Sequence, residues 1–234
     1  MTAPDERIPP PDHHRDVTGG WLRPAVFGVT DGLVSNGSLI LGVAGSGASS
    51  HAVVLAGLAG LAAGAFSMAT GEYISVTSQQ ELTLAEIEVE KLELRRVPQA
   101  EQAELAQVYV ERGVEPALAK EVARQLSANP DQAWRVHVRE ELGVDPDDLP
   151  SPWTAAGSSF VSFTLGALLP LLPYLLGADA IAATVVLVVA GLFAAGAAVA
   201  RFTTRSWVYS GLRQLVLGGA AAALTYAIGR AVGT

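Results

Sequence analysis

Five long apolar stretches dominate the sequence, and each is long enough to cross a bilayer as a helix. They lie at about residues 23–46, 51–77, 153–176, 179–200 and 206–232. A membrane-spanning helix needs about 20 mainly apolar residues. The pattern therefore predicts an all-α polytopic membrane protein with five transmembrane helices.

The second apolar stretch continues beyond the membrane as an acidic helix. It contains neither proline nor glycine between Gly71 and Arg96, so the helix has no internal break. Three shorter helices should follow, at residues 99–112, 115–128 and 131–142. Apolar positions at helical spacing, such as Leu105, Leu118 and Val138, predict a small core among them.

These elements divide the chain into four parts. Residues 1–22 are polar and proline-rich, which predicts a disordered N-terminal tail; they lack the apolar core of a signal peptide. Residues 23–77 hold the first two transmembrane helices. Residues 78–150 form an acidic helical domain, and residues 151–234 hold the last three transmembrane helices.

The net charge of the chain is concentrated in the acidic domain. Residues 78–150 contain sixteen Asp and Glu against eight Lys and Arg, which accounts for the whole net charge of −8. This acidity argues against nucleic acid as a partner and suits cations. The absence of cysteine excludes thiolate metal sites, disulfides and a cysteine nucleophile.

Lys and Arg also predict the orientation in the membrane. Arg23, Arg201 and Arg205 lie on the same side as the acidic domain, which places that domain and the N-terminus in the cytosol. The abundance of Ala and Gly, with two Lys against thirteen Arg, is typical of a GC-rich bacterial genome. We therefore expect a bacterial plasma membrane; in a eukaryote the same topology would suit a vacuolar membrane.

Two acidic residues lie inside the first two spans. Asp31 is about 12 Å into the first span, and Met68 and Glu72 are about 13 Å and 7 Å from the cytosolic exit of the second, at 1.5 Å per residue. Antiparallel packing would bring Asp31 and Met68 nearly level. Acids in a membrane generally mark an ion or proton pathway, and a thioether with oxygens suits Fe²⁺. The alternative is core packing for Met68 and pairing of the acids with an arginine such as Arg213.

Six side chains of the acidic domain are candidate metal ligands: Glu90, Glu93, Glu101, Glu104, His137 and Glu141. The first four form two i, i+3 pairs on either side of Pro98, where the chain can fold back and bring the pairs together. Clustered carboxylates repel one another unless a cation or protons neutralise them. Glu and His donors suit Fe²⁺, Mn²⁺ or Zn²⁺. The alternative is a solvated acidic helix face.

Four segments of the chain resemble the vacuolar iron transporter family: VFGVTDGLVSN, AGAFSMATGEYISVTSQ, ELAQVYVERG and SFTLGALLPLLPYLL. They occur in order and with matching spacing, and the resemblance runs from about Arg23 to the C-terminus. It implies a homodimer of five-span protomers, with a cytosolic metal-binding domain attached to a long second helix. It also implies transport of Fe²⁺ out of the cytosol in exchange for protons.

The resemblance assigns roles to individual residues. The family's pathway residues match Asp31, Met68 and the Glu72 of the GEY motif. Its metal-domain glutamates match Glu90, Glu93, Glu101, Glu104 and Glu141. Some members carry methionines on the last cytosolic helix, where this chain has His137 and Val138.

The sequence thus predicts a transporter in which cytosolic glutamates gather the ion and pass it through Glu72 to Asp31 and Met68 between two protomers. A carboxylate that holds either a proton or a metal ion would couple the two fluxes. Two alternatives stay open: a Mn²⁺ or Zn²⁺ transporter of the same architecture, and a membrane-anchored metal buffer or sensor. The chain lacks the Glu-x-x-His pattern of di-iron bundles, a nucleophile triad and a phosphate loop, so we do not expect an enzyme.

Overall fold

The computed structural model describes residues 20–178, 181–201 and 205–232, and within these ranges all regular structure is helical. Nearly all of the predicted N-terminal tail lies outside them. The elements in chain order are α1 (Leu22–Asp31), η2 (Gly32–Asn36), α2 (Gly37–Gly45), α3 (Ser50–Arg96), α4 (Pro98–Glu111), α5 (Pro116–Leu126), α6 (Pro130–His137), η3 (Val138–Leu142), α7 (Pro152–Leu175), α8 (Ile181–Val199) and α9 (Trp207–Val232).

Within the described ranges, five helical segments are long and apolar enough to cross a membrane. They are Leu22–Gly45, which joins α1, η2 and α2, and the helices α3, α7, α8 and α9. Each begins within a few residues of the predicted span, and four of them also end there; α3 continues to Arg96, as the predicted acidic extension of the second span requires. The prediction of an all-helical chain with five candidate membrane spans is therefore confirmed.

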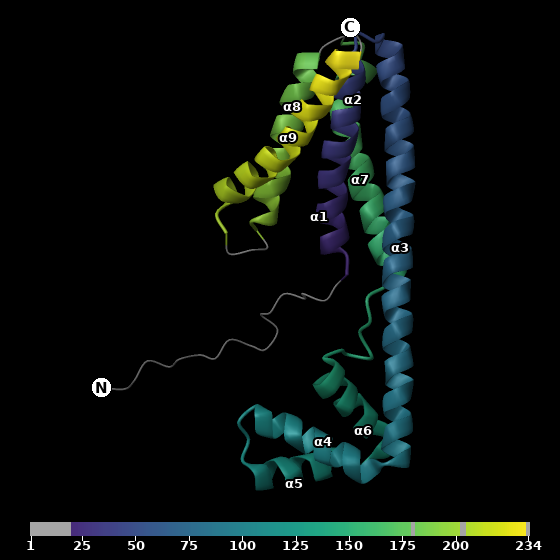
Figure 1. Cartoon of the computed structure of the whole chain (residues 1–234), viewed down its shortest axis with the longest axis vertical. Coiled ribbons are helices and arrows are strands. Elements are labelled where there is room, and N and C mark those ends of the chain that lie inside the picture. The colour runs from purple at the N-terminus through teal and green to yellow at the C-terminus, as the bar shows by residue number, and fades with distance from the viewer. Residues whose placement is uncertain (1–19, 179–180, 202–204, 233–234) are drawn as a thin grey trace, which may run out of the picture.

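Helix α3 runs the full length of the molecule (Figure 1). Its 47 residues correspond to about 70 Å, more than twice the hydrocarbon thickness of a bilayer at about 30 Å. The other spans lie on one side of its first half, with α7 packed between α3 and the α1–α2 segment, and the α8–α9 hairpin on the other side of that segment. We call the second half of α3, with α4, α5, α6 and η3, the distal unit.

Proline and capping residues explain where the helices begin. Helices α4 to α7 each have proline in the first helical position, where its fixed φ suits the helix and its missing N–H is not needed. The Ser151 hydroxyl caps α7 by accepting a hydrogen bond from the Thr154 N–H at 3.4 Å, and the Asn129 side chain caps α6 in the same way.

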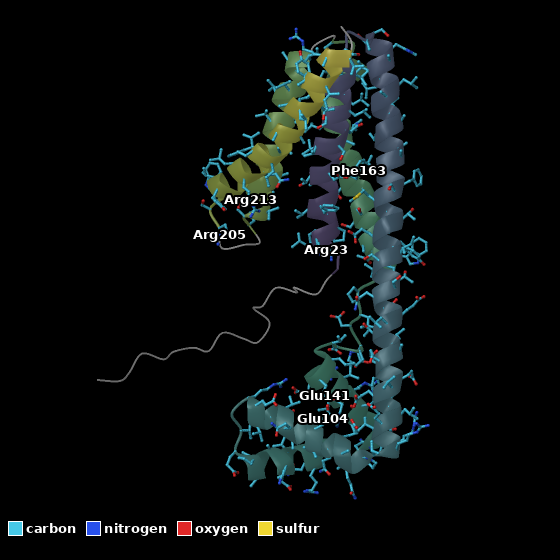
Figure 2. The ribbon with its side chains drawn as sticks, in the orientation of Figure 1. Arg23, Glu104, Glu141, Phe163, Arg205 and Arg213 are labelled. Atoms are coloured by element: carbon cyan, nitrogen blue, oxygen red, sulfur yellow. The ribbon has the colours of Figure 1, made fainter. Side chains whose placement is uncertain are left out.

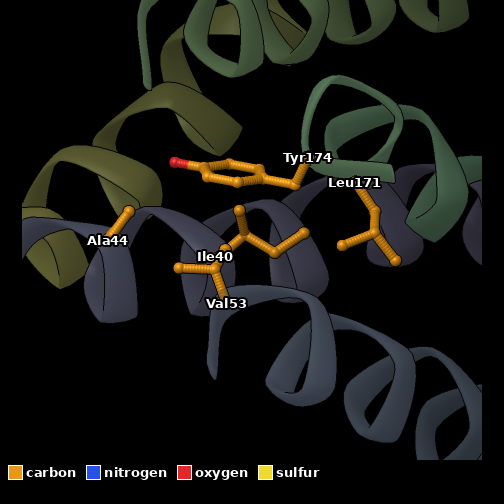
Figure 3. Packing of buried hydrophobic residues seen from close by; sticks show 5 residues of the cluster. All are labelled: Ile40, Ala44, Val53, Leu171 and Tyr174. Atoms are coloured by element: carbon orange, nitrogen blue, oxygen red, sulfur yellow. The ribbon is translucent and has the colours of Figure 1, made fainter. Parts of the chain in front are cut away.

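A buried apolar cluster ties α2, α3 and α7 together at the end of the bundle farthest from the distal unit. Its members are Ile40, Ala44, Val53, Leu171 and Tyr174 (Figure 3). Lipid tails are as apolar as these side chains, so the contact stabilises the bundle by close packing and not by removal of water.

Small residues allow α1 and α7 to approach closely. A Cβ added at Gly166 would clash with the carbonyl oxygen of Val29 and lie 3.1 Å from the backbone nitrogen of Leu33. Gly157, on the same helix, has open space at that position.

We expect Gly166→Ala to destabilise the protein and Gly157→Ala not to. Because the atoms that meet the new methyl group at Gly166 belong to the backbone, they cannot rotate away. Overpacking of this kind costs about 1–3 kcal/mol. A lower melting temperature in detergent for Gly166→Ala alone would agree with this packing, whereas equal melting temperatures would contradict the close α1–α7 contact.

The distal unit differs from the predicted arrangement in two respects. The expected core residue Leu118 is 55% exposed, and α5 instead buries Ala119 and Ala123. The small side chain of Ala123 packs with Leu105 and Ala106 of α4 in one buried cluster. The last predicted helix, residues 131–142, is divided into α6 and the π-helical turn η3.

Candidate metal centre and membrane pathway

Four side chains of the distal unit converge on one point. They are Glu90 of α3, Glu101 of α4, His137 of α6 and Glu141 of η3. Each offers one possible ligand atom, and these atoms all lie within 4.8 Å of one another. Three carboxylates and one imidazole could therefore contact a single ion. We call this group the four-residue cluster.

The turn between α3 and α4 brings the first two residues together. Helix α3 ends at Arg96 and α4 begins at Pro98, so the chain reverses within two residues. On α3, Ile87 is buried one turn before Glu90. On α4, Leu105 is buried one turn after Glu101. Both glutamates therefore project from the apolar faces by which their helices pack into the distal unit.

The turn η3 places the other two residues. The Nδ1 atom of His137 lies 2.9 Å from Glu141 Oε1 and 3.2 Å from Glu90 Oε1. The hydrogen-bond geometry is satisfied toward Glu141, whereas the contact with Glu90 is one of charge proximity, since Glu90 Oε1 has no hydrogen-bond partner. His137 thus links the carboxylates of α3 and η3.

A second set of contacts fixes η3 against α4. The Tyr109 hydroxyl donates to Glu140 Oε1 at 3.1 Å, and the Arg112 guanidinium forms an ion pair with the same carboxylate. Arg112 also lies over the Tyr109 ring, 5.9 Å from its centroid. Because Glu140 is held toward α4, its neighbour Glu141 faces the cluster.

Three of the four side chains in the cluster are almost completely buried, which is unusual for ionisable groups. The exposed fractions are 6% for Glu90, 5% for Glu101 and 0% for His137. Glu90 Oε1 and His137 Nε2 are buried and have no hydrogen-bond partner among the residues that the structure describes. Charged and polar groups are rarely buried in this way unless they are paired or coordinate a metal. The donor set and its unpaired atoms therefore fit a divalent cation.

The pKa values describe how protons and a cation would compete for this cluster. Burial raises the pKa of Glu90 to about 7, and the charge of Glu141 adds to the rise. Burial also raises the pKa of Glu101. Burial alone would lower the pKa of His137, but the hydrogen bond and charge of Glu141 outweigh it, so that pKa is raised. A pKa of about 7 lets the Glu90 carboxyl gain or lose a proton near neutral pH, so a cation that entered the cluster would compete with protons there.

Two of the predicted ligands lie outside the cluster. Glu93 and Glu104 are exposed, although their charges help to raise the pKa of Glu101, so they are close neighbours. Glu104 and Glu141 lie in the same part of the distal unit (Figure 2). The structure thus brings four of the six predicted ligands together and leaves two at its exposed edge.

The predicted membrane residues lie along α1 and α3. Asp31 is the last residue of α1 and is partly exposed. Its neighbour Gly32 contacts the backbone of Phe163, and Met68 packs against the apolar cluster that contains Phe163. Asp31 and Met68 therefore lie at a similar height along α7, near the Phe163 labelled in Figure 2. Glu72 lies one turn nearer the distal unit and is partly exposed.

Two features were not predicted from the sequence. The Ser35 hydroxyl donates a hydrogen bond to Asp31 Oδ1 at 2.6 Å, for which the i, i+4 spacing is the only sequence signal. The contacts of Glu140 with Tyr109 and Arg112 join residues about 30 positions apart. These contacts depend on how η3 packs against α4, and the sequence carries no local signal for that packing.

Comparison of the sequence with known proteins identifies a family. The sequence pattern of the VIT family matches residues 22–230. The chain belongs to the VIT family. Vacuolar iron transporter 1 of Arabidopsis thaliana is 34% identical over 228 residues, which cover 94% of this chain and 91% of that protein. Vacuolar iron transporter 1 of Eucalyptus grandis is 33% identical over 228 residues, again 94% of this chain and 91% of that protein.

A third relative has a higher identity over a shorter stretch of the chain. The vacuolar iron transporter of Acanthamoeba castellanii is 44% identical over 155 residues, which cover 66% of this chain and 56% of that protein. The family resemblance expected from the sequence is therefore confirmed. Because VIT family proteins are transporters, the expectation that this chain is not an enzyme is confirmed as well.

Proposed function

We propose that this VIT family protein carries Fe²⁺ out of the cytosol in exchange for protons. The observation that carries the proposal is the buried four-residue cluster, which is attached to the same helix, α3, that crosses the membrane. A site on such a helix can collect ions from solution and deliver them along it. Its relatives in plants and in Acanthamoeba castellanii are named vacuolar iron transporters.

The distribution of arginines supports a cytosolic position for the distal unit. Arg23, Arg205 and Arg213 lie at the end of the bundle that faces the distal unit (Figure 2). Arg230 lies in the last turn of α9, at the opposite end. The side with more Lys and Arg faces the cytosol. The N-terminus and the distal unit are then cytosolic, and the membrane is the plasma membrane in a bacterium or the vacuolar membrane in a eukaryote.

The donor set supports a borderline divalent ion. Carboxylates and imidazole accept Fe²⁺, Mn²⁺ and Zn²⁺, so the cluster by itself does not distinguish these ions. The names of the relatives favour Fe²⁺. Glu93 and Glu104, at the exposed edge, would attract the ion toward the buried cluster.

The pathway through the membrane passes from the cluster to Glu72 and then to Asp31 and Met68. Glu90 and Glu72 are 18 positions apart on one helix, or about 27 Å, so the ion crosses a solvated stretch between them. At Asp31 a carboxylate holds either the cation or a proton. Protons that arrive from the far side displace the cation and return with the empty site, which couples the two fluxes.

A homodimer would complete this pathway. Phe27, Asp31, Ser35 and Leu39 form one stripe of the first span, at four-residue spacing; Phe27 is 56% and Leu39 37% exposed. A carboxylate in such a stripe is unfavourable against lipid. A second copy of the chain, packed on the same stripe, would shield the two Asp31 carboxylates from lipid and place them close together.

Ion flux into proteoliposomes tests this function. We expect external Fe²⁺, kept reduced, to enter vesicles that contain the protein, and an internal pH dye to report proton exit with the same time course. Mn²⁺ and Zn²⁺ added as competitors would rank the three ions. Metal bound by the solubilised protein without any flux would favour a buffer or sensor, and flux without proton exit would contradict the exchange.

A further inference from the structure

The hydrogen bond between Ser35 and Asp31 is different from the other hydroxyl contacts inside the membrane helices. Helical Ser and Thr usually donate to the backbone carbonyl one turn earlier, as Thr164 does to Phe160 at 2.7 Å and Thr225 to Ala221 at 2.9 Å. Ser35 donates instead to the Asp31 carboxylate at 2.6 Å. Such short bonds to a charged oxygen are among the stronger hydrogen bonds in proteins.

The backbone around this pair is held by α7. Ser35 belongs to the π-helical turn η2, which buries Gly32, Leu33 and Asn36. The Asn36 side-chain amide donates to the Ala167 carbonyl at 2.7 Å, and Gly32 contacts the backbone of Phe163. Ser35 itself is exposed. The turn is therefore anchored to α7 on one face and presents the hydroxyl on the other; π-helical turns frequently occur at functional sites.

Two neighbouring oxygens thus face outward between apolar side chains. Phe27 and Leu39, one turn to either side on the same stripe, are both exposed. In a membrane, an outward polar pair of this kind needs a polar partner. A serine hydroxyl has one proton and two lone pairs. It can therefore keep donating to Asp31 while a lone pair faces a cation.

We propose that Ser35 is a second oxygen ligand for the divalent cation at Asp31. The inference rests on the proposed function, because it takes Asp31 as part of the pathway. A neutral hydroxyl improves binding of the cation without adding charge, so exchange with protons stays with the carboxylate. In a dimer packed on this stripe, the two copies would supply two carboxylate and two hydroxyl ligands.

The test compares Fe²⁺ uptake by proteoliposomes that contain Ser35→Ala, Ser35→Thr, Ser38→Ala or Asp31→Ala. Ser38 is the matched control, since it lies three residues further on, is 8% exposed and has a hydroxyl without a hydrogen-bond partner. We expect Ser35→Ala to raise the KM for Fe²⁺ about 10-fold with little change in kcat. Ser35→Thr, which keeps the hydroxyl, should restore the original KM, and Ser38→Ala should not change it.

The four variants distinguish failure of the Ser35 ligand role from failure of the proposed transport pathway. If Asp31→Ala stops uptake while Ser35→Ala keeps the original KM, the ligand role of Ser35 is wrong and the transport function stands. A lower kcat with an unchanged KM in Ser35→Ala would also overturn the ligand role. If Asp31→Ala transports normally, both the proposed pathway and the role of Ser35 fail.

Discussion

Replacing Asp31 by alanine should reduce Fe²⁺ transport by about 100-fold or more. Asp31 is the single acidic residue of the first span, and it lies on an outward stripe at the height of Met68. In the pathway proposed above, Asp31 is the group that exchanges a proton for a cation, so the variant would lack that group. Loss of a group that hydrogen-bonds to a metal ligand typically lowers metal affinity or activity 10- to 100-fold. Loss of a charged ligand itself should therefore lower transport by about 100-fold or more.

The measurement is Fe²⁺ uptake by proteoliposomes together with proton exit. An internal control is available in the same variant, because the four-residue cluster lies far from Asp31: Met68 and Glu90 are about 33 Å apart along α3. Metal binding to the solubilised Asp31→Ala protein should therefore equal that of the unaltered protein. Undiminished uptake would show that the ion crosses elsewhere, and lost metal binding would indicate misfolding instead of a blocked pathway.

Glu101→Gln should weaken metal binding by the distal unit by about 100-fold. Glu101 is 5% exposed and contributes one of the four converging ligand atoms. The amide has nearly the same shape as the carboxylate but carries no charge and is a poorer ligand for hard or borderline cations. Because burial already raises the pKa of the Glu101 carboxyl, a neutral side chain should be tolerated and the fold preserved.

Titration calorimetry with Mn²⁺, which is stable in air, measures this effect in the full-length protein in detergent. Glu111→Gln is the matched control, since Glu111 lies on the same helix, is exposed and accepts a hydrogen bond from the Gln107 amide within α4. Equal affinities for the two variants would move the metal site away from the buried cluster. Loss of binding in Glu104→Gln instead would place it at the exposed edge.

Helix spacing predicted the pairs of candidate ligands, but packing decided which member of each pair is buried in the cluster. Residues i and i+3 of a helix lie only about 60° apart, so Glu90 and Glu93 both fit a face that points toward α4. The i, i+3 spacing identified the pair, but it could not predict which of the two glutamates is buried in the cluster. Packing decided, because Ile87 is buried against the distal unit and turns Glu90 inward while Glu93 remains exposed. The same holds for Glu101 and Glu104 on α4.

The sequence alone determined the number of spans, their bounds and the helical continuation of α3. These features depend on length, apolarity and local signals such as Pro98 and Pro152, which act within a few residues. The sequence also singled out Asp31 and Glu72, because acidic residues in apolar runs are rare, and Met68, because its depth in the second span matches that of Asp31 in the first. The tertiary structure decided what needs contact between distant residues: the convergence of four candidate ligands from three helices and a π-turn, the ion pair of Arg112 with Glu140, and the burial of Ala119 in place of Leu118. Such contacts depend on how helices turn about their axes when they pack, and the order of residues along the chain does not record that rotation.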